Sequence, residues 1–253
     1  MSVTAGRPAV GAGKWPKTFP PLTPDDEAVS HDWMQHFHTA ISTNFGRVER
    51  FNHGYPIRHA PREFATSLEI GAGVGGHYAH ELRALSPLQA ENYYAVELRP
   101  NMAAELSRRY PSVKVYVGDC QRPLPFAEGF FDRVIANNVL EHLPDLPRCL
   151  KEVHRLLHPD RGIFSVVIPC EGGLGYSLGR AVTSKRQYEK RYGKPYAEFI
   201  RRDHVNTARE VLAELRPLFS VAGREFWPLR VPLVALNLFI GLTLTPRRPS
   251  RRR

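Results

Sequence analysis

The sequence predicts an α/β protein whose core is a mostly parallel β-sheet with helices covering both faces. Short apolar segments rich in β-branched residues alternate along the chain with helix-length segments, and a run of glycines directly follows the first apolar segment. This alternation is typical of parallel sheets, whose strands are buried on both faces and joined by helices. With 253 residues, the chain can bury a full core as one large domain or two small ones.

Five strands and three helices are expected between residues 67 and 168. The expected strands are Ser67–Ile70, Asn92–Glu97, Val113–Val117, Phe131–Ala136 and Gly162–Ile168. The expected helices are Gly76–Leu85, Pro100–Arg109 and Leu146–Leu157, and the second begins with proline, a favoured first-turn residue.

The C-terminal third continues this pattern after an insert. Thr207, with Glu210 three residues later, fits the capped start of a helix that runs to about Arg216. The apolar stretches Phe219–Trp227 and Leu233–Thr245 then finish the chain. We therefore expect a single domain over residues 25–246.

The N-terminal segment differs from this core in composition. Residues 1–24 are rich in Gly, Pro and small residues and are predicted to be disordered. Residues 25–62 are polar and rich in histidine. They predict one or two helices ahead of the sheet, which Pro56 and Pro61 interrupt.

The charge of the chain is uneven. A net charge of +10 favours an acidic partner: a phosphate-bearing substrate, a nucleic acid or an anionic membrane surface. The excess lies in a basic C-terminal tail, residues 247–253, and in a basic, aromatic insert, residues 171–206. The three cysteines show no metal-binding spacing and the N-terminus shows no secretory signal, so reduced thiols and a cytoplasmic location are expected.

The glycine run points to a nucleoside-like cofactor. The segment from Ser67 to His77 reads SLEIGAGVGGH, in which Gly71, Gly73 and Gly75 supply a tight turn between strand and helix. Glycine accepts positive backbone torsions at low cost and lets a ligand approach the main chain. The GxGxxG pattern alone also fits a dinucleotide site. Glu69, two residues before the turn, would repel a pyrophosphate but suits the cationic S-adenosylmethionine (SAM).

Polar residues follow the next three expected strands. Glu97 ends the second strand, where a carboxylate can accept hydrogen bonds from two ribose hydroxyls, as it can in NAD sites. Asp119 follows the third strand and can accept from an adenine amino group, with Cys120 and Gln121 along the adenine edge. Asn137 ends the fourth strand, next to the expected sulfonium. Each of these residues also fits a structural role in a turn.

Four blocks, taken in order, resemble the class I SAM-dependent methyltransferases, especially the small-molecule group that includes ubiquinone-pathway enzymes. The blocks are LEIGAGVGGH, YYAVELRPNM, VYVGDCQRPLPFAEGFFDRVIANNVLEHLPD and RLLHPDRGIFSVVIP, and the resemblance covers roughly residues 64–170. It implies a Rossmann-like three-layer sandwich with a mostly parallel seven-stranded sheet, whose buried antiparallel last strand falls within Val231–Pro246. It also implies SAM as the methyl donor.

The resemblance and the residue chemistry together give a set of candidate cofactor-binding residues. These are Glu69, Gly71, Ala72, Gly73, Gly75, Glu97, Leu98, Asp119, Cys120, Gln121 and Asn137. Two histidines are candidate catalytic residues: His142 in VLEHLPD, which could take a proton from a substrate hydroxyl, and His204, before the helix that follows the insert. Structural roles remain open for both. No metal is predicted, because the histidines show no spacing of the HExxH type.

The insert is the candidate acceptor-binding region. Its basic residues interleave with Tyr188, Tyr192 and Tyr196, whose spacing of four would place them on one face of a helix, although Pro195 limits the length of that helix. The insert could be a lid for an anionic or ring-bearing acceptor, or a solvated basic helix pair. RNA binding also fits, but no known RNA-binding module is visible.

Val231–Pro246 is the most apolar stretch, and it is too short to span a membrane. Besides a buried strand, it could be an interfacial patch that contacts anionic lipid and suits a lipid-linked acceptor.

The sequence thus predicts an enzyme that transfers a methyl group from SAM, by in-line displacement, to a small-molecule or lipid-linked acceptor, with oxygen as the expected acceptor atom. The alternatives are an RNA or protein methyltransferase, which the charge favours, and an NAD-dependent oxidoreductase, which only the GxGxxG pattern favours.

Overall fold

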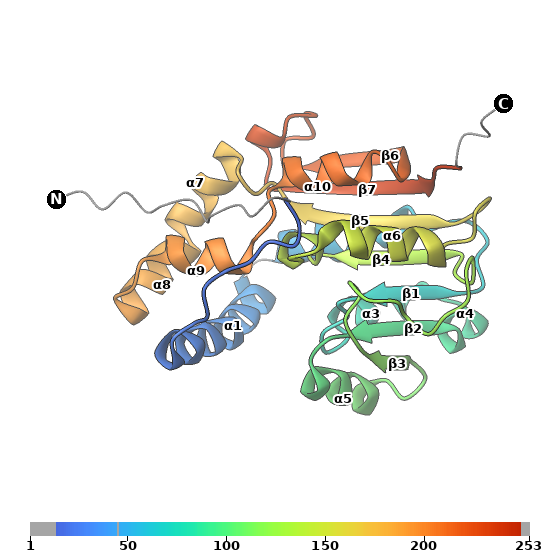
Figure 1. The fold of residues 1–253 in the computed structure, drawn as a ribbon, viewed down its shortest axis with the longest axis horizontal. Helices are drawn as coiled ribbons and strands as arrows, with labels where there is room; N and C mark the ends of the chain where they lie inside the picture. Colours follow the sequence, from blue (N-terminus) through green and yellow to red (C-terminus); the bar gives the residue numbers. More distant parts are fainter. Residues whose placement is uncertain (1–13, 45, 249–253) are drawn as a thin grey trace.

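The computed structural model describes residues 14–44 and 46–248, and within this range the strands form one seven-stranded sheet in the order β3-β2-β1-β4-β5-β7-β6. Neighbouring strands from β3 to β5 run parallel, whereas β7 pairs antiparallel with both β5 and β6 (Figure 1). The strands are β1 (Ser67–Ile70), β2 (Tyr93–Glu97), β3 (Lys114–Val117), β4 (Arg133–Asn137), β5 (Ile163–Pro169), β6 (Phe219–Trp227) and β7 (Phe239–Pro246). The predicted fold class and its antiparallel last strand are confirmed.

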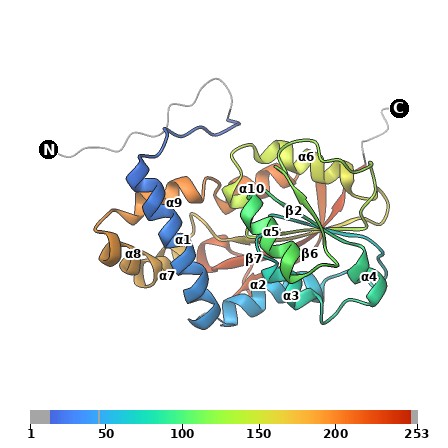
Figure 2. The same cartoon turned by 90° about the horizontal axis from the view of Figure 1, so that it is seen from below.

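Helices cover both faces of the sheet, so the molecule has three layers. Figure 2 shows α2 and α3 on one face and α6 and α10 on the other. The α-helices are α1 (Pro24–Asn44), α2 (Gly46–Arg58), α3 (Gly76–Glu81), α4 (Pro87–Glu91), α5 (Pro100–Arg109), α6 (Leu146–Leu156), α7 (Leu174–Val182), α8 (Ser184–Tyr192), α9 (Tyr196–Asp203) and α10 (Ala208–Leu215), and the short 3-10 turns are η1 (Leu140–His142) and η2 (Val234–Leu236). The start of α10 is capped as predicted, because Thr207 and Glu210 form a reciprocal capping box.

The central strands are buried because helices cover them on both sides. Every residue of β1 is buried, and β5 is buried from Phe164 to Pro169. The main hydrophobic core joins β1, β4, β5 and β7 to α6 and α10. The predicted bounds of β1 and β6 match the observed ones, and those of β2 to β5 differ by at most two residues. Apolar residues such as Phe131 and Val113 lie buried just outside the hydrogen-bonded ladder.

Two helix predictions in the first half are wrong in detail. The first helix after the glycine turn ends at Glu81 and not at Leu85, and a second short helix, α4, follows it. The cause is Pro87, which disfavours a helical conformation at Ser86, so that Ser86 caps α4 instead. Pro56 does not interrupt the helical segment: it lies inside α2, where its buried carbonyl accepts a hydrogen bond from Arg133.

The prediction of disorder over residues 1–24 is wrong for residues 14–23; residues 1–13 lie outside the described part of the chain. Residues 14–23 run along the domain surface ahead of α1. Trp15 packs against the main core, and the Lys17 backbone amide donates to the carbonyl of Pro144 (2.9 Å). The Lys17 ammonium group binds Glu210 (2.9 Å). These long-range contacts are invisible to a composition argument.

The insert contains α7, α8 and α9, which lie beside α1 (Figures 1 and 2). The three tyrosines do not share one helix, because Gly193 in the left-handed conformation (φ 65°) ends α8 and Tyr196 starts α9 directly after Pro195, the residue expected to limit the helix. The three tyrosine rings nevertheless converge on Trp33 of α1, with centroid distances of 5.3, 6.3 and 6.3 Å. Tyr188 and Tyr196 are buried in this cluster, so they are not available to stack on an acceptor or on RNA bases.

The C-terminal apolar stretch divides into two parts. Residues 228–238 form a loop that contains η2, and β7 begins only at Phe239. Asn237 is buried and holds this loop, because its side chain bonds the backbone of Leu229, Val231 and Leu233. Residues 249–253 of the predicted basic tail lie outside the described range. Among the described helices, none has the length and apolarity needed to cross a membrane.

Candidate active site

The carboxyl ends of the parallel strands meet on one side of the molecule, facing α1 and α7–α9 (Figure 1). The chain passes from β1 outward to β2 and β3 and then returns to β4 on the other side of β1. This reversal is the point at which open α/β sheets bind ligands. The predicted cofactor residues follow the ends of β1, β2, β3 and β4, so the topology places them along one edge.

The glycine turn after β1 contains three left-handed residues, Gly71, Gly73 and Gly75 (φ 65°, 57° and 84°). A Cβ atom on Gly71 would lie 2.6 Å from Val139, and one on Gly75 would lie 2.6 Å from Leu106, so packing requires both glycines. A Cβ atom on Gly73 would meet no heavy atom of the described residues within 4 Å. Gly73 is therefore the position at which a ligand can lie on the backbone.

Glu97 links the end of β2 to this turn. One carboxylate oxygen accepts from the amide of Gly73 (2.8 Å), and the other accepts from the amide of Arg99 (2.9 Å). Each oxygen keeps a further lone pair for a hydroxyl donor. Of the neighbouring candidates, Ala72 is buried and Leu98 is exposed. The geometry thus places a fixed carboxylate beside the open glycine, as a ribose-binding role requires.

The residues after β3 form a rigid turn. Asp119 accepts from the backbone amide and the side-chain amide of Gln121 (2.9 and 3.0 Å). The Gln121 carbonyl oxygen accepts in turn from the backbone amide of Asp145 (2.7 Å), at the start of α6. Cys120 between them is buried. The contacts of Asp119, Cys120 and Gln121 with an adenine stay predictions.

Asn137 at the end of β4 contacts a histidine that the sequence did not single out. Its side-chain nitrogen lies 3.0 Å from Nδ1 of His53, which comes from α2. Burial, together with the nearby His77 and His80, lowers the pKa of His53 to about 3. His53 is therefore neutral and accepts the hydrogen bond, which fixes the orientation of the Asn137 amide at the strand end.

Glu69 lies inside the protein. It is fully buried, and the Tyr93 hydroxyl donates to its carboxylate (2.9 Å). Burial raises the pKa of Glu69, although the nearby His77 and the Tyr93 hydroxyl oppose this effect. The structure therefore gives Glu69 an internal partner, and its direct interaction with a cationic cofactor stays a prediction.

A second buried carboxylate lies close by. Glu81 forms two hydrogen bonds with Arg133 of β4 (2.6 and 2.9 Å), and the Arg133 side chain is completely buried. His77 lies 3.0 Å from Glu81 on the same helix. Burial opposes ionisation, but the Arg133 charge together with the hydrogen bonds from His77 and Arg133 outweighs it and lowers the pKa of Glu81 to about 2. This ion pair fixes the end of α3 against the start of β4.

The structure brings together the two candidate catalytic histidines. Their ring centroids are 4.9 Å apart, and Nδ1 of His142 lies 2.7 Å from the carbonyl oxygen of Asp203, one residue before His204. Burial disfavours the charged form of His142, but the hydrogen bond to Asp203 and the nearby carboxylates raise its pKa to about 9. At neutral pH the free ring is protonated, which does not favour the predicted role as a general base.

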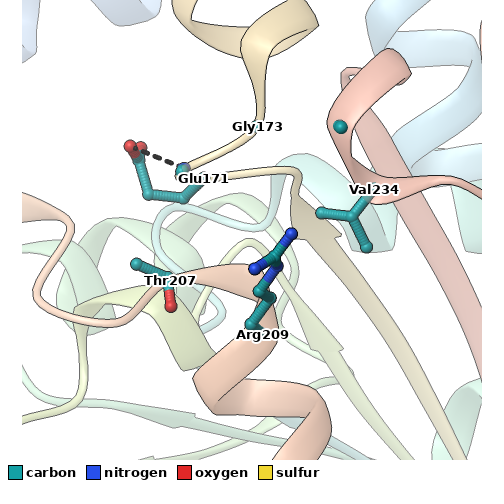
Figure 3. Close-up of a pocket in the computed structure, with 7 residues that line it drawn as sticks. Glu171, Gly173, Thr207, Arg209 and Val234 are labelled. Carbon is teal, nitrogen blue, oxygen red and sulfur yellow. Dashed lines mark hydrogen bonds between the residues drawn. The ribbon is translucent and has the colours of Figure 1, made fainter.

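A pocket of about 150 Å³ lies beside the end of β5 (Figure 3). Glu171 in its lining lies 2.9 Å from Nδ1 of His204. In Figure 3, Glu171 and Gly173 come from the segment after β5, Thr207 and Arg209 from the start of α10, and Val234 from the η2 loop. None of the predicted cofactor residues lines it. Its place beyond β5 puts it on the acceptor side of the edge.

Residues 68–165 match the family model described as the Methyltransferase domain. Among curated proteins, the chain is 25% identical over 135 residues to a demethylmenaquinone methyltransferase from Chlorobaculum parvum, which covers 53% of this chain and 54% of the relative. Residues 68–165 therefore form a methyltransferase domain of the class I, SAM-dependent type. The Rossmann-like methyltransferase fold predicted from the sequence blocks is thereby confirmed, and SAM is the methyl donor.

Further similarities agree with this assignment. The chain is 30% identical over 110 residues to a malonyl-[acyl-carrier protein] O-methyltransferase from Halorhodospira halophila, covering 43% of this chain and 35% of the relative. The solved structure of 1,6-didemethyltoxoflavin-N1-methyltransferase from Burkholderia thailandensis superposes with a TM-score of 0.57 at 20% identity, covering 92% of this chain and 94% of the other, which shows a shared fold. The chain spans about half or less of the length of these curated relatives.

The residues at this methyltransferase edge fit SAM. Open space over Gly73 and a carboxylate fixed beside it suit a nucleoside that lies on the turn. The sequence missed Glu141, His53, Asp203 and Glu171, which the fold brings beside predicted residues. Glu141 alone carried a local signal, since it lies within the VLEHLPD block.

Proposed function

We propose that the protein transfers a methyl group from SAM to an oxygen atom of a small, lipid-linked acceptor at a membrane surface. The observation that carries the SAM-dependent part is the pairing of an open, left-handed Gly73 with the Glu97 carboxylate, 2.8 Å from its amide, within a domain that matches the methyltransferase family. The acceptor part has separate support, given below.

When bound, SAM supplies a methyl group already activated on a sulfonium. Glu97 accepts hydrogen bonds from ribose hydroxyls, and the backbone of Gly73 leaves room for the nucleoside. Asn137, fixed by His53, lies at the end of β4, and its carbonyl oxygen accepts from the Asn138 side chain (3.3 Å). These groups position the cofactor, and positioning supplies much of the rate in an in-line displacement.

The acceptor proposal is supported by an exposed apolar patch. Leu174, Leu178 and Val182 lie four residues apart on one face of α7 and are 74%, 71% and 72% exposed. The η2 loop packs against this helix, since a Cβ atom on Gly175 would lie 2.9 Å from the carbonyl oxygen of Leu236. Four further exposed aliphatic residues belong to the loop: Leu229, Val231, Leu233 and Leu236.

Exposed cations border the patch on its flanking segments: Lys185 and Arg186 on α8, and Arg230 on the loop. Apolar side chains beside basic ones are the pattern by which peripheral proteins bind anionic bilayers. Two relatives are named for the acceptors demethylmenaquinone and malonyl-[acyl-carrier protein], and the second is named as an O-methyltransferase. These names support a small acceptor and transfer to oxygen.

Calorimetric titration with SAM tests the cofactor part. Gly73→Leu should weaken SAM binding at least about 100-fold (about 2.7 kcal/mol), because the new side chain fills the space over the turn. Gly193→Leu is the matched control, since Gly193 is also left-handed (φ 65°) and also has no described heavy atom within 4 Å of its Cβ position. Equal SAM affinity in both variants, or binding of NADH in place of SAM, would contradict the proposal.

Vesicle sedimentation tests the membrane part. The protein should bind vesicles containing anionic phosphatidylglycerol, and Leu178→Glu should reduce binding at least about fivefold by placing a charge in the patch. Leu88→Glu is the control, since Leu88 is 61% exposed on α4, outside the patch. Identical binding by both variants would remove the lipid surface from the proposal. Mass spectrometry of lipid extracts incubated with labelled SAM would then identify the acceptor and the methylated atom.

A further inference from the structure

Three potential metal ligands meet where the turn after β4 lies against the end of α9. Glu141 and His142 belong to η1, and His204 directly follows α9. One ligand atom from each residue lies within 4.8 Å of the other two. Bonds of about 2.0–2.2 Å to a shared ion would bring these atoms to about 3–3.5 Å from one another. The three groups therefore need to close by little more than about 1 Å.

Both imidazole rings are held through Nδ1. Nδ1 of His142 lies 2.7 Å from the carbonyl oxygen of Asp203, and Nδ1 of His204 lies 2.9 Å from the carboxylate of Glu171. Arg180 fixes Glu171 with two hydrogen bonds of 2.6 and 2.7 Å. When Nδ1 donates its proton to such an acceptor, Nε2 carries the free lone pair. This is the arrangement that orients histidines in metal sites.

Glu141 supplies the anionic donor. It is 2% exposed, and its Oε2 atom has no hydrogen-bond partner among the described residues. Its Oε1 atom lies 3.7 Å from Nε2 of His142. Leaving a buried carboxylate oxygen without a partner costs free energy, which a bound cation would recover. An oxygen of Asp203 lies 3.7 Å from Nε2 of His204 and is a fourth donor within reach.

We propose that Glu141, His142 and His204 bind one divalent transition-metal ion, with Asp203 available as a fourth ligand. Two imidazoles and a carboxylate favour ions such as Zn²⁺ or Fe²⁺ over Mg²⁺ or Ca²⁺, which prefer oxygen donors. The carboxylates that favour a proton on the free His142 ring equally favour a metal, and the ion displaces that proton on binding.

The site lies on the acceptor side of the sheet edge. Glu141 follows the end of β4 by four residues, and the His142 side chain is 33% exposed. An ion held there keeps a coordination position for an oxygen atom of the acceptor and polarises it. This role rests on the proposed methyl transfer, whereas metal binding itself does not.

Metal titration of the full-length, untagged protein tests the site. After dialysis against EDTA, Zn²⁺ should bind with a stoichiometry of one per chain by calorimetry at pH 7.5. Co²⁺ in place of Zn²⁺ should give the intense visible absorption of a four- or five-coordinate centre. Glu141→Gln and His204→Gln should each weaken Zn²⁺ binding at least about tenfold, because each removes one donor while keeping a similar side-chain volume.

His80→Gln is the matched control. His80 stacks on His53 at a centroid distance of 4.6 Å, in the other histidine cluster of the described chain. It should leave Zn²⁺ binding unchanged. The proposal would be overturned if the wild-type protein bound no stoichiometric Zn²⁺. It would also be overturned if His80→Gln lost Zn²⁺ binding while His204→Gln kept it, and Glu141, His142 and His204 would then form only an internal ion-pair cluster.

Two measurements keep the outcomes separate. Circular dichroism checks that each variant is folded; if Glu141→Gln is not, His204→Gln carries the test, because Glu171 keeps its partner Arg180. SAM titration of the same samples separates the two proposals. Metal binding without SAM binding would contradict the proposed function alone, and SAM binding without metal binding would contradict this inference alone.

Discussion

The cofactor half and the acceptor half of the sheet edge are stabilised in different ways. In the proposed cofactor half, buried backbone and charged groups connect the glycine turn to β2 and α3 to β4, as in the bonds from Gly73 to Glu97 and from Arg133 to Glu81. In the acceptor half, α1 is joined to a segment more than 150 residues later through Trp33 and the tyrosines of α8 and α9. The comparison shows that the helices α1, α8 and α9 have their own small hydrophobic core, separate from the contacts that hold the proposed cofactor residues.

Arg133→Met gives the largest expected effect and disrupts the cofactor half. Removing the buried cation leaves the buried Glu81 carboxylate with only His77 beside it, which should lower the free energy of unfolding by about 3–5 kcal/mol. Urea denaturation measures the loss. Arg133→Met combined with Glu81→Leu should recover most of it, because no unpaired charge then remains. A single variant as stable as the wild-type protein would mean that this ion pair does not stabilise the platform.

Acidification should weaken the same pair in a defined range. The pKa of Glu81 falls from 4.5 to about 2 on folding, since the Arg133 charge and the hydrogen bonds from His77 and Arg133 together outweigh burial. The stabilising contribution is therefore complete above about pH 4.5 and is lost as the pH falls toward about 2, at most about 3 kcal/mol. Urea denaturation of wild-type protein and Glu81→Gln at several pH values should show their difference shrinking in this range. A constant difference would contradict the assignment.

Trp33→Leu disrupts the acceptor half. The smaller side chain leaves the rings of Tyr188 and Tyr196 incompletely packed, at a cost of about 2 kcal/mol. Hydrogen exchange should increase in α1, α8 and α9, while SAM affinity should stay unchanged because the cofactor half does not contact this cluster. Faster exchange throughout the sheet would show instead that the two halves unfold together.

Thr207→Ala gives the smallest effect, about 1 kcal/mol, through loss of the cap of α10. Ser86→Ala removes an equivalent capping box from α4, a five-residue helix without buried residues, and should cost less. Thermal unfolding of both variants measures the contrast. If Ser86→Ala lowered the stability more than Thr207→Ala, the loss of stability would depend on the cap itself and not on how well the capped helix packs.

Much of the fold was predictable because its signals are local. The glycine turn, the α5 boundaries and the Thr207 cap each depend on residues within one or two turns of chain, and the structure has all three. Predictions failed where distant groups decide the conformation. Pro56 stays helical beside a buried Arg133 from β4, and residues 14–23 are held by Pro144 and Glu210.

The sequence by itself determined the α/β class and the methyltransferase domain, because strand and turn chemistry follow from nearby residues. Only the tertiary structure decided that Glu69 is internal, that His53 fixes Asn137, and that His142 and His204, 62 positions apart, share one cluster with Glu141. The physical reason is that the partners of these groups lie far away in the sequence and come together only in the folded chain. Their charge states depend on burial and on these partners, which sequence spacing does not reveal.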